Sequence, residues 1–302
     1  MQPTYYERLL ADRNSPLGEV LDEDIAKLKG RGSSIIPNPE DAEFAGSLGN
    51  YLKRALEAFK SSLAQETSAY QFELFQQTPA YQEAMVQMAG NQYWTYESFF
   101  YFKALGEQTV RVSSDTCREL LQAPLPGTGA DLRLANPALM LVFEAPEMID
   151  ALYAGERRQA PGRSDYAAPV YVFVVEVPPS EGFKYRRLKL LSAHSGPHAH
   201  HRIEVRRLLL QDDLSLEEIL KTDWAKVAKS QTEIKRPEIT ISAVKGPGAS
   251  RTEDYGYLGA RLPYYRAIVG SLVRYIAGAP KPTRAVAVAP TAEVTRLKYS
   301  EL

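Results

Sequence analysis

The chain has 302 residues, 44% of them hydrophobic, and its formal net charge is -1 at neutral pH. A chain of this size can bury a large core, as one large domain or as two of ordinary size. The near-neutral charge argues against a protein that coats nucleic acid or an anionic membrane with its whole surface, so an electrostatic partner has to meet a local patch. The single cysteine, Cys117, excludes an intramolecular disulfide framework and favours a reducing, cytoplasmic location.

The sequence also predicts a soluble protein without a membrane partner. Its first residues lack the apolar run and flanking positive charge of a signal peptide. No uninterrupted apolar stretch approaches the roughly 20 residues that a bilayer-spanning helix needs.

Helical patterns dominate the first half of the chain. Asn38, followed by Pro39 and two acids, predicts a helix start, because Asn caps free N–H groups and Pro tolerates the first helical position. Apolar residues then recur at helical spacing and predict a long helix over residues 39–66. Thr78, also followed by a proline, opens another helix. The aromatic stretch 92–105 has almost no Lys or Arg, so we interpret it as core rather than as a platform for stacked bases.

The pattern changes after the first third of the chain. Residues 124–131 are rich in turn formers, and we place a border there. The predicted organisation is a helical domain at 1–125, an α+β domain at 126–278 and an extended tail at 279–302. Strands are expected at 138–145, 169–178 and 238–244, and helices at 146–155, after Ser215 and from Pro263. The predicted fold class is therefore α+β, with a helical N-terminal half packed against a mixed or antiparallel sheet that carries a few helices.

One stretch, residues 183–211, departs sharply from the average composition. It holds all four histidines of the chain and seven cations against a single acid, Glu204. Two extended runs, 183–191 and 202–210, joined by a Gly-Pro turn, predict a β-hairpin, with a helix as the alternative for the second run. The seven cations of this basic hairpin are Lys184, Arg186, Arg187, Lys189, Arg202, Arg206 and Arg207.

The cations of the basic hairpin allow two interpretations. A twisted β-ribbon that carries them on a solvent-facing surface can lie along a phosphate backbone and release counterions. However, Arg186 shares a strand face with leucines whereas Arg187 and Lys189 share the other face, so the pattern gives no clean basic face. The structural alternative is that the cations protect a sheet edge, or pair with the acids that follow the hairpin. Those acids are Asp212, Asp213, Glu217 and Glu218.

The histidines raise a third interpretation, a metal site. His198 and His200 point the same way on a strand, and Glu204 lies an even number of positions further on. Two imidazoles and one carboxylate leave open positions on a divalent transition metal for substrate or water. The spacing His-x-His-x3-Glu resembles the first motif of cupin barrels over these seven residues, and that resemblance implies a metal-binding role for all three. His194 or His201 is a possible fourth ligand.

The function that the sequence favours is that of an intracellular, non-enzymatic binding or regulatory protein. It engages a protein or nucleic acid through the basic hairpin, and it needs no cofactor. The competing hypothesis is a metal-dependent enzyme with His198, His200 and Glu204 as ligands. The sequence does not predict the oligomeric state.

Overall fold

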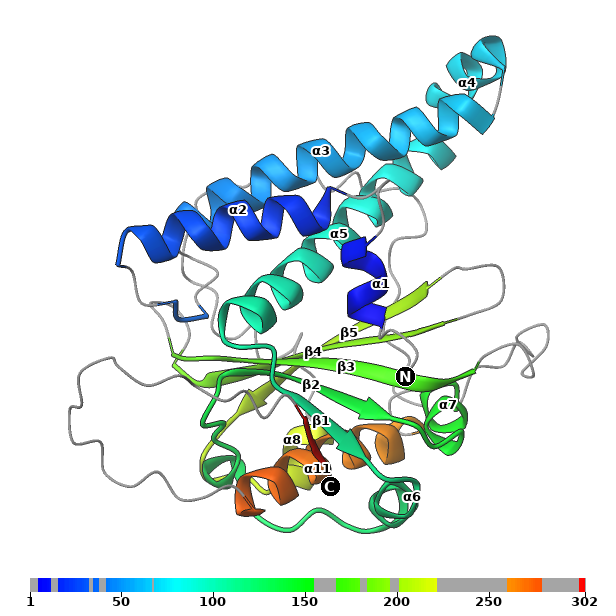
Figure 1. Cartoon of the computed structure of the whole chain (residues 1–302). Helices are drawn as coiled ribbons and strands as arrows, with labels where there is room; N and C mark the ends of the chain where they lie inside the picture. The colour runs from blue at the N-terminus through cyan, green and yellow to red at the C-terminus, as the bar shows by residue number, and fades with distance from the viewer. Residues whose placement is uncertain are drawn as a thin grey trace.

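The computed structural model describes residues 5–11, 16–32, 35–37, 42–66, 68–154, 167–179, 184–195, 201–221, 260–278 and 299–301. Within these residues a six-stranded sheet in the order β5-β4-β3-β2-β1-β6 lies between two layers of helices (Figure 1). β1 pairs in parallel with β2 and β6, whereas β2 to β5 form an antiparallel series. The strands are β1 (Thr109–Val112), β2 (Ala138–Phe143), β3 (Ala167–Val177), β4 (Arg186–Ser195), β5 (His201–Leu210) and β6 (Tyr299–Glu301).

One face of the sheet is covered by the N-terminal helices, and the other by helices from later in the chain (Figure 1). The N-terminal helices are α1 (Tyr5–Ala11), α2 (Leu17–Gly30), α3 (Ala42–Glu66), α4 (Ala69–Gln76) and α5 (Pro79–Ala104). The opposite layer contains α6 (Ser114–Gln122), α7 (Glu147–Leu152), α8 (Leu216–Lys221) and α11 (Leu262–Gly278). The expected α+β class, with a helical N-terminal half against a mixed sheet, is confirmed.

Side-chain caps set several helix starts where the sequence predicts them. The hydroxyl of Thr78 accepts a hydrogen bond from the backbone N–H of Tyr81, and the proline that follows begins α5. Ser215 and Glu218 bond to each other's backbone N–H groups at the start of α8, as expected for a capping box. The long helix expected at 39–66 is confirmed over 42–66 as α3, whereas its expected start at Asn38 and Pro39 lies outside the described residues.

The core has two halves because side chains alternate along each strand. In β4, Leu188 and Leu190 pack with α11, whereas Leu191 and Ala193 pack with the N-terminal helices. The single thiol, Cys117, lies in the α11 half with no exposed surface. Burial raises the pKa of this thiol to about 12, which suits a structural role.

The aromatic stretch of α5 is core, as predicted. Residues 99–102 are all buried, and Phe99 packs on Phe173 of β3 with ring centroids 4.7 Å apart. Tyr96 stacks on Tyr51 of α3 at 4.8 Å and donates a 2.6 Å hydrogen bond to the buried Asp24 of α2. Burial, reinforced by that carboxylate, raises the pKa of Tyr96 well above its ordinary value. These rings join α2, α3 and α5 to the sheet.

The sheet takes strands from both sides of the expected border at 125/126. β1 precedes the border, yet it pairs with β2, which follows it. The division into domains stays a prediction. Three residues of the expected tail form β6, and the strand expected at 238–244 lies outside the described residues.

Candidate functional site

The basic hairpin is formed as predicted, by β4 and β5 in antiparallel register, which excludes the helical alternative for the second run. Its cations do not share a face. Arg186 and Arg206 lie on the side of α11, and Arg187, Lys189 and Arg207 lie on the side of α5, because they alternate with the core leucines. The expectation of one common solvent-facing basic surface is therefore wrong.

Arg186 is buried on the α11 side of the sheet, where it links β4 to neighbouring segments. Its guanidinium donates 2.7 Å hydrogen bonds to the carbonyl oxygens of Leu132 and Gly129. It also pairs with Glu176 of β3 at 2.7 Å and with Asp212 at 3.0 Å. Burial opposes the charge of Arg186, but the hydrogen bonds that it donates to both carboxylates outweigh this effect, so the pKa of Arg186 is raised. The same contact lowers the pKa of Asp212. Here the expected pairing with the acids after the hairpin is found.

Lys189 is buried on the α5 side of the sheet, where it links β4 to α5. Its ammonium bonds to Glu97 of α5, and the two side chains are only 8% and 2% exposed. Burial lowers the pKa of Lys189, and the carboxylate of Glu97 opposes this shift. Trp94, one turn earlier in α5, lies 5.7 Å from the Lys189 ammonium and 4.3 Å from the Arg207 guanidinium. The hairpin thus holds α5 by one ion pair and two cation–π contacts.

Arg206 connects the hairpin to the opposite layer. Its guanidinium donates to the carbonyl of Leu220 in α8 and stacks over the ring of Tyr265 in α11, 3.9 Å from the centroid. Arg187, 4% exposed, donates a 3.4 Å bond to the carbonyl of Pro178. Among the hairpin cations whose side chains the structure describes, only Lys184 is exposed, with its ammonium 5.5 Å from the Tyr185 centroid.

Two of the other acids after the hairpin, Glu217 and Glu218, have different partners. Glu217 forms a two-pronged ion pair with Arg266 of α11, with N–O distances of 2.6 and 2.8 Å. Hydrogen bonds from Arg266 lower the pKa of Glu217. Glu218 caps its own helix. Of these three acids, Asp212 is the one that pairs with a hairpin cation.

The histidines are only partly described. His194 has no exposed surface, and its Nε2 lies 2.7 Å from the hydroxyl of Tyr153, the residue that follows α7. Two residues earlier, Ser192 accepts a 2.7 Å bond from Tyr264 of α11. This placement makes His194 a satisfied core histidine.

The expected metal site falls largely outside the described residues. His198 and His200 lie there, and His201 and Glu204 are described only as backbone positions of β5. Within the described part of the chain, no group of three or more His, Cys, Asp or Glu side chains could hold a metal ion. The metal hypothesis stays a prediction.

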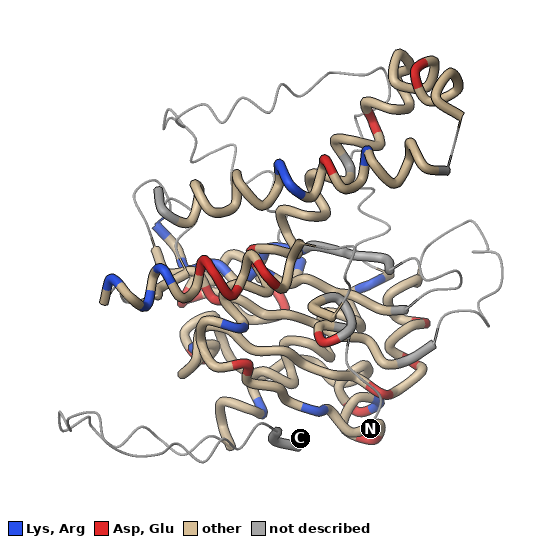
Figure 2. Tube along the Cα trace, turned by 45° about the horizontal axis from the view of Figure 1, so that its top comes forward, with Lys and Arg blue, Asp and Glu red and all other residues tan. Residues whose placement is uncertain are grey.

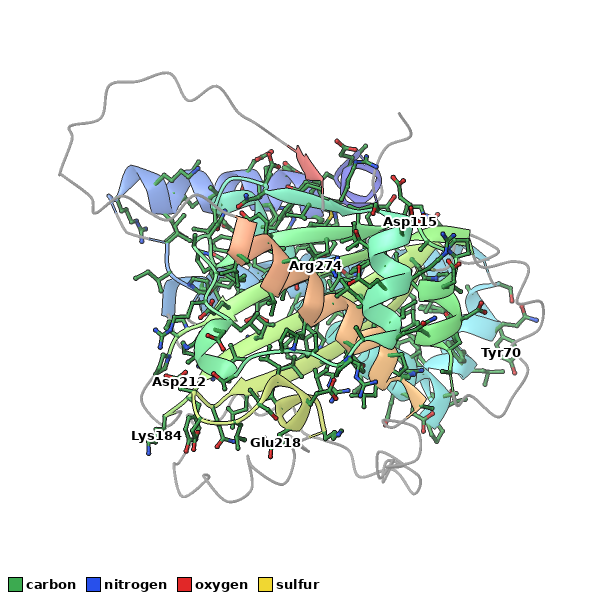
Figure 3. The ribbon with its side chains drawn as sticks, turned by 90° about the horizontal axis from the view of Figure 1, so that it is seen from below. Tyr70, Asp115, Lys184, Asp212, Glu218 and Arg274 are labelled. Carbon is green, nitrogen blue, oxygen red and sulfur yellow. The ribbon has the colours of Figure 1, made fainter. Side chains whose placement is uncertain are left out.

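A different feature is exposed: the helical arm, which we define as residues 57–92 of α3, α4 and α5. It projects from the body of the molecule, with α4 at its tip (Figure 1). Of the arm side chains that the structure describes, none is buried, although many are aromatic or aliphatic. Tyr70, Leu74 and Val86 are 71%, 49% and 52% exposed. Tyr70 lies on the far side of the molecule from Lys184 (Figure 3).

The arm has internal contacts but no core of its own. Tyr81 of α5 meets Phe72 and Phe75 of α4 edge-on, at 6.3 and 5.5 Å. These three rings are all half-buried. Monomeric proteins rarely leave clustered large apolar side chains in water without a partner surface. The sequence predicts the helices of the arm, but not the point at which they extend past the sheet.

Comparison with known proteins gives no further constraint. No protein-family model, no curated protein and no solved structure matches the chain. In the described part of the chain, every helix is too short or too polar to cross a membrane.

Proposed function

We propose that this chain is a binding or regulatory protein that engages a macromolecular partner through the helical arm. The observation that carries the proposal is the combination of exposed apolar side chains with the absence of any buried side chain among the described residues of the arm. Burial of a Leu, Val or aromatic side chain is worth about 1.5–3 kcal/mol, so a partner that covers the tip gains several kcal/mol.

The contacts of the basic hairpin support the same choice of surface. Arg186 and Lys189 are committed to internal carboxylates, and a buried cation in an ion pair gains little by leaving its partner for an external phosphate. Phosphate recognition by the hairpin therefore depends on Lys184, on half-buried Arg206 and Arg207, and on Arg202, whose side chain is not described.

The metal-dependent enzyme is the competing proposal. It depends on His198 and His200, and the described residues supply no observation that favours it. Metal analysis of untagged protein, with His198→Ala and His200→Ala as controls, tests it independently of the arm.

Site-specific photo-crosslinking tests the binding role. We expect a photoreactive residue in place of Tyr70 to crosslink the full chain to one defined protein species in an extract of its cells. The matched control is the same residue in place of Ile36, which is 57% exposed but lies outside the arm. A third protein, with the photoreactive residue in place of Lys184, samples the hairpin.

The outcomes separate the two surfaces. A product at position 70 that is absent at positions 36 and 184 supports the arm. Products of equal yield at all three positions, or a product at position 184 alone, contradict it. Capture of nucleic acid at position 184 returns the choice to the basic hairpin.

A further inference from the structure

We draw no further inference here: the strongest candidate, the exposed apolar patch of the helical arm at Tyr70, Leu74 and Val86 (Figures 1 and 2), carries nothing beyond the proposed binding role, because nothing in the structure shows what covers it.

Discussion

Replacing Lys189 by methionine is expected to lower the free energy of unfolding by about 3–5 kcal/mol, because it leaves a buried carboxylate without its ammonium. Glu97 is 2% exposed in its side chain, so water cannot take the place of the lysine. Urea denaturation followed by circular dichroism measures the loss. Lys184→Met removes an exposed cation of the same hairpin and should change stability by no more than about 0.5 kcal/mol.

The reciprocal variant has a distinct pH dependence. Burial lowers the pKa of Lys189, and Glu97 opposes that shift. Glu97→Leu removes the opposition, so the folded protein binds fewer protons than the unfolded chain between the lowered pKa and the ordinary value of about 10.4. Since stability rises with pH wherever the unfolded chain binds more protons, the stability deficit of Glu97→Leu should shrink as the pH rises toward the ordinary lysine pKa of about 10.4.

The paired variant provides the control for this site. Lys189→Met with Glu97→Leu replaces the ion pair by apolar groups, and we expect its stability to lie within about 1 kcal/mol of the wild type. If the double variant loses as much stability as each single variant, the two side chains do not act as one buried ion pair.

Arg186→Met is expected to lower the free energy of unfolding by a similar amount, about 3–5 kcal/mol, for a different reason. The side chain donates to two backbone carbonyls and to the largely buried Glu176, and each loses this donor at once. The carbonyl of Gly129 lies in a tight joint, because a Cβ on that glycine would stand 2.1 Å from the carbonyl oxygen of Gln211. The backbone at Gly129 therefore cannot move in to fill the space that the guanidinium leaves.

Two further substitutions check the role of Arg186. Arg186→Lys keeps the charge but not the planar fork, so it should recover less than half of the loss. Asp212→Asn removes the exposed carboxylate, which is 56% accessible, and solvent screening should keep its effect on the free energy of unfolding well below that of Arg186→Met. If Asp212→Asn lowers the free energy of unfolding as much as Arg186→Met does, the contacts of Arg186 inside the protein are not the source of its stabilising effect. Chemical denaturation measures all three variants.

Local patterns predicted most of the secondary structure in the described residues. The caps at Thr78 and Ser215 act through backbone groups within three residues, so the sequence contains the whole cause. The aromatic stretch 92–105 and the apolar strands are core for a similar reason, since composition alone decides that they are buried.

The environment of the hairpin cations could not be predicted in the same way. Lys189 and Glu97 are 92 positions apart, and Arg186 meets carbonyl groups more than 50 positions away. A Lys or Arg in an extended run can face water or an internal carboxylate, and the choice depends on which helix packs against that strand. The alternation of cations with leucines was the available signal, and it correctly indicated that no single basic face exists.

The exposure of the helical arm could not be predicted from the sequence either. The sequence predicts its helices, but the point where the sheet ends beneath α5 depends on strand pairing elsewhere in the chain. One signal was present: the N-terminal half of α5 carries apolar residues around the helix, including Met85, Val86 and Met88, where a surface helix has one apolar face. Such a pattern indicates a helix that is covered on more than one side.

Hydrogen exchange of the full chain, alone and bound to the protein captured by crosslinking at position 70, tests the central claim most directly. The claim is that the described cations of the basic hairpin bind groups inside the protein and that the helical arm is the surface that binds the partner. We expect peptides from β4 and the end of β5 to exchange slowly in both states, and peptides from residues 57–92 to become protected only in the bound state. Fast exchange in the hairpin, with an arm that stays unprotected in the bound state, would contradict it.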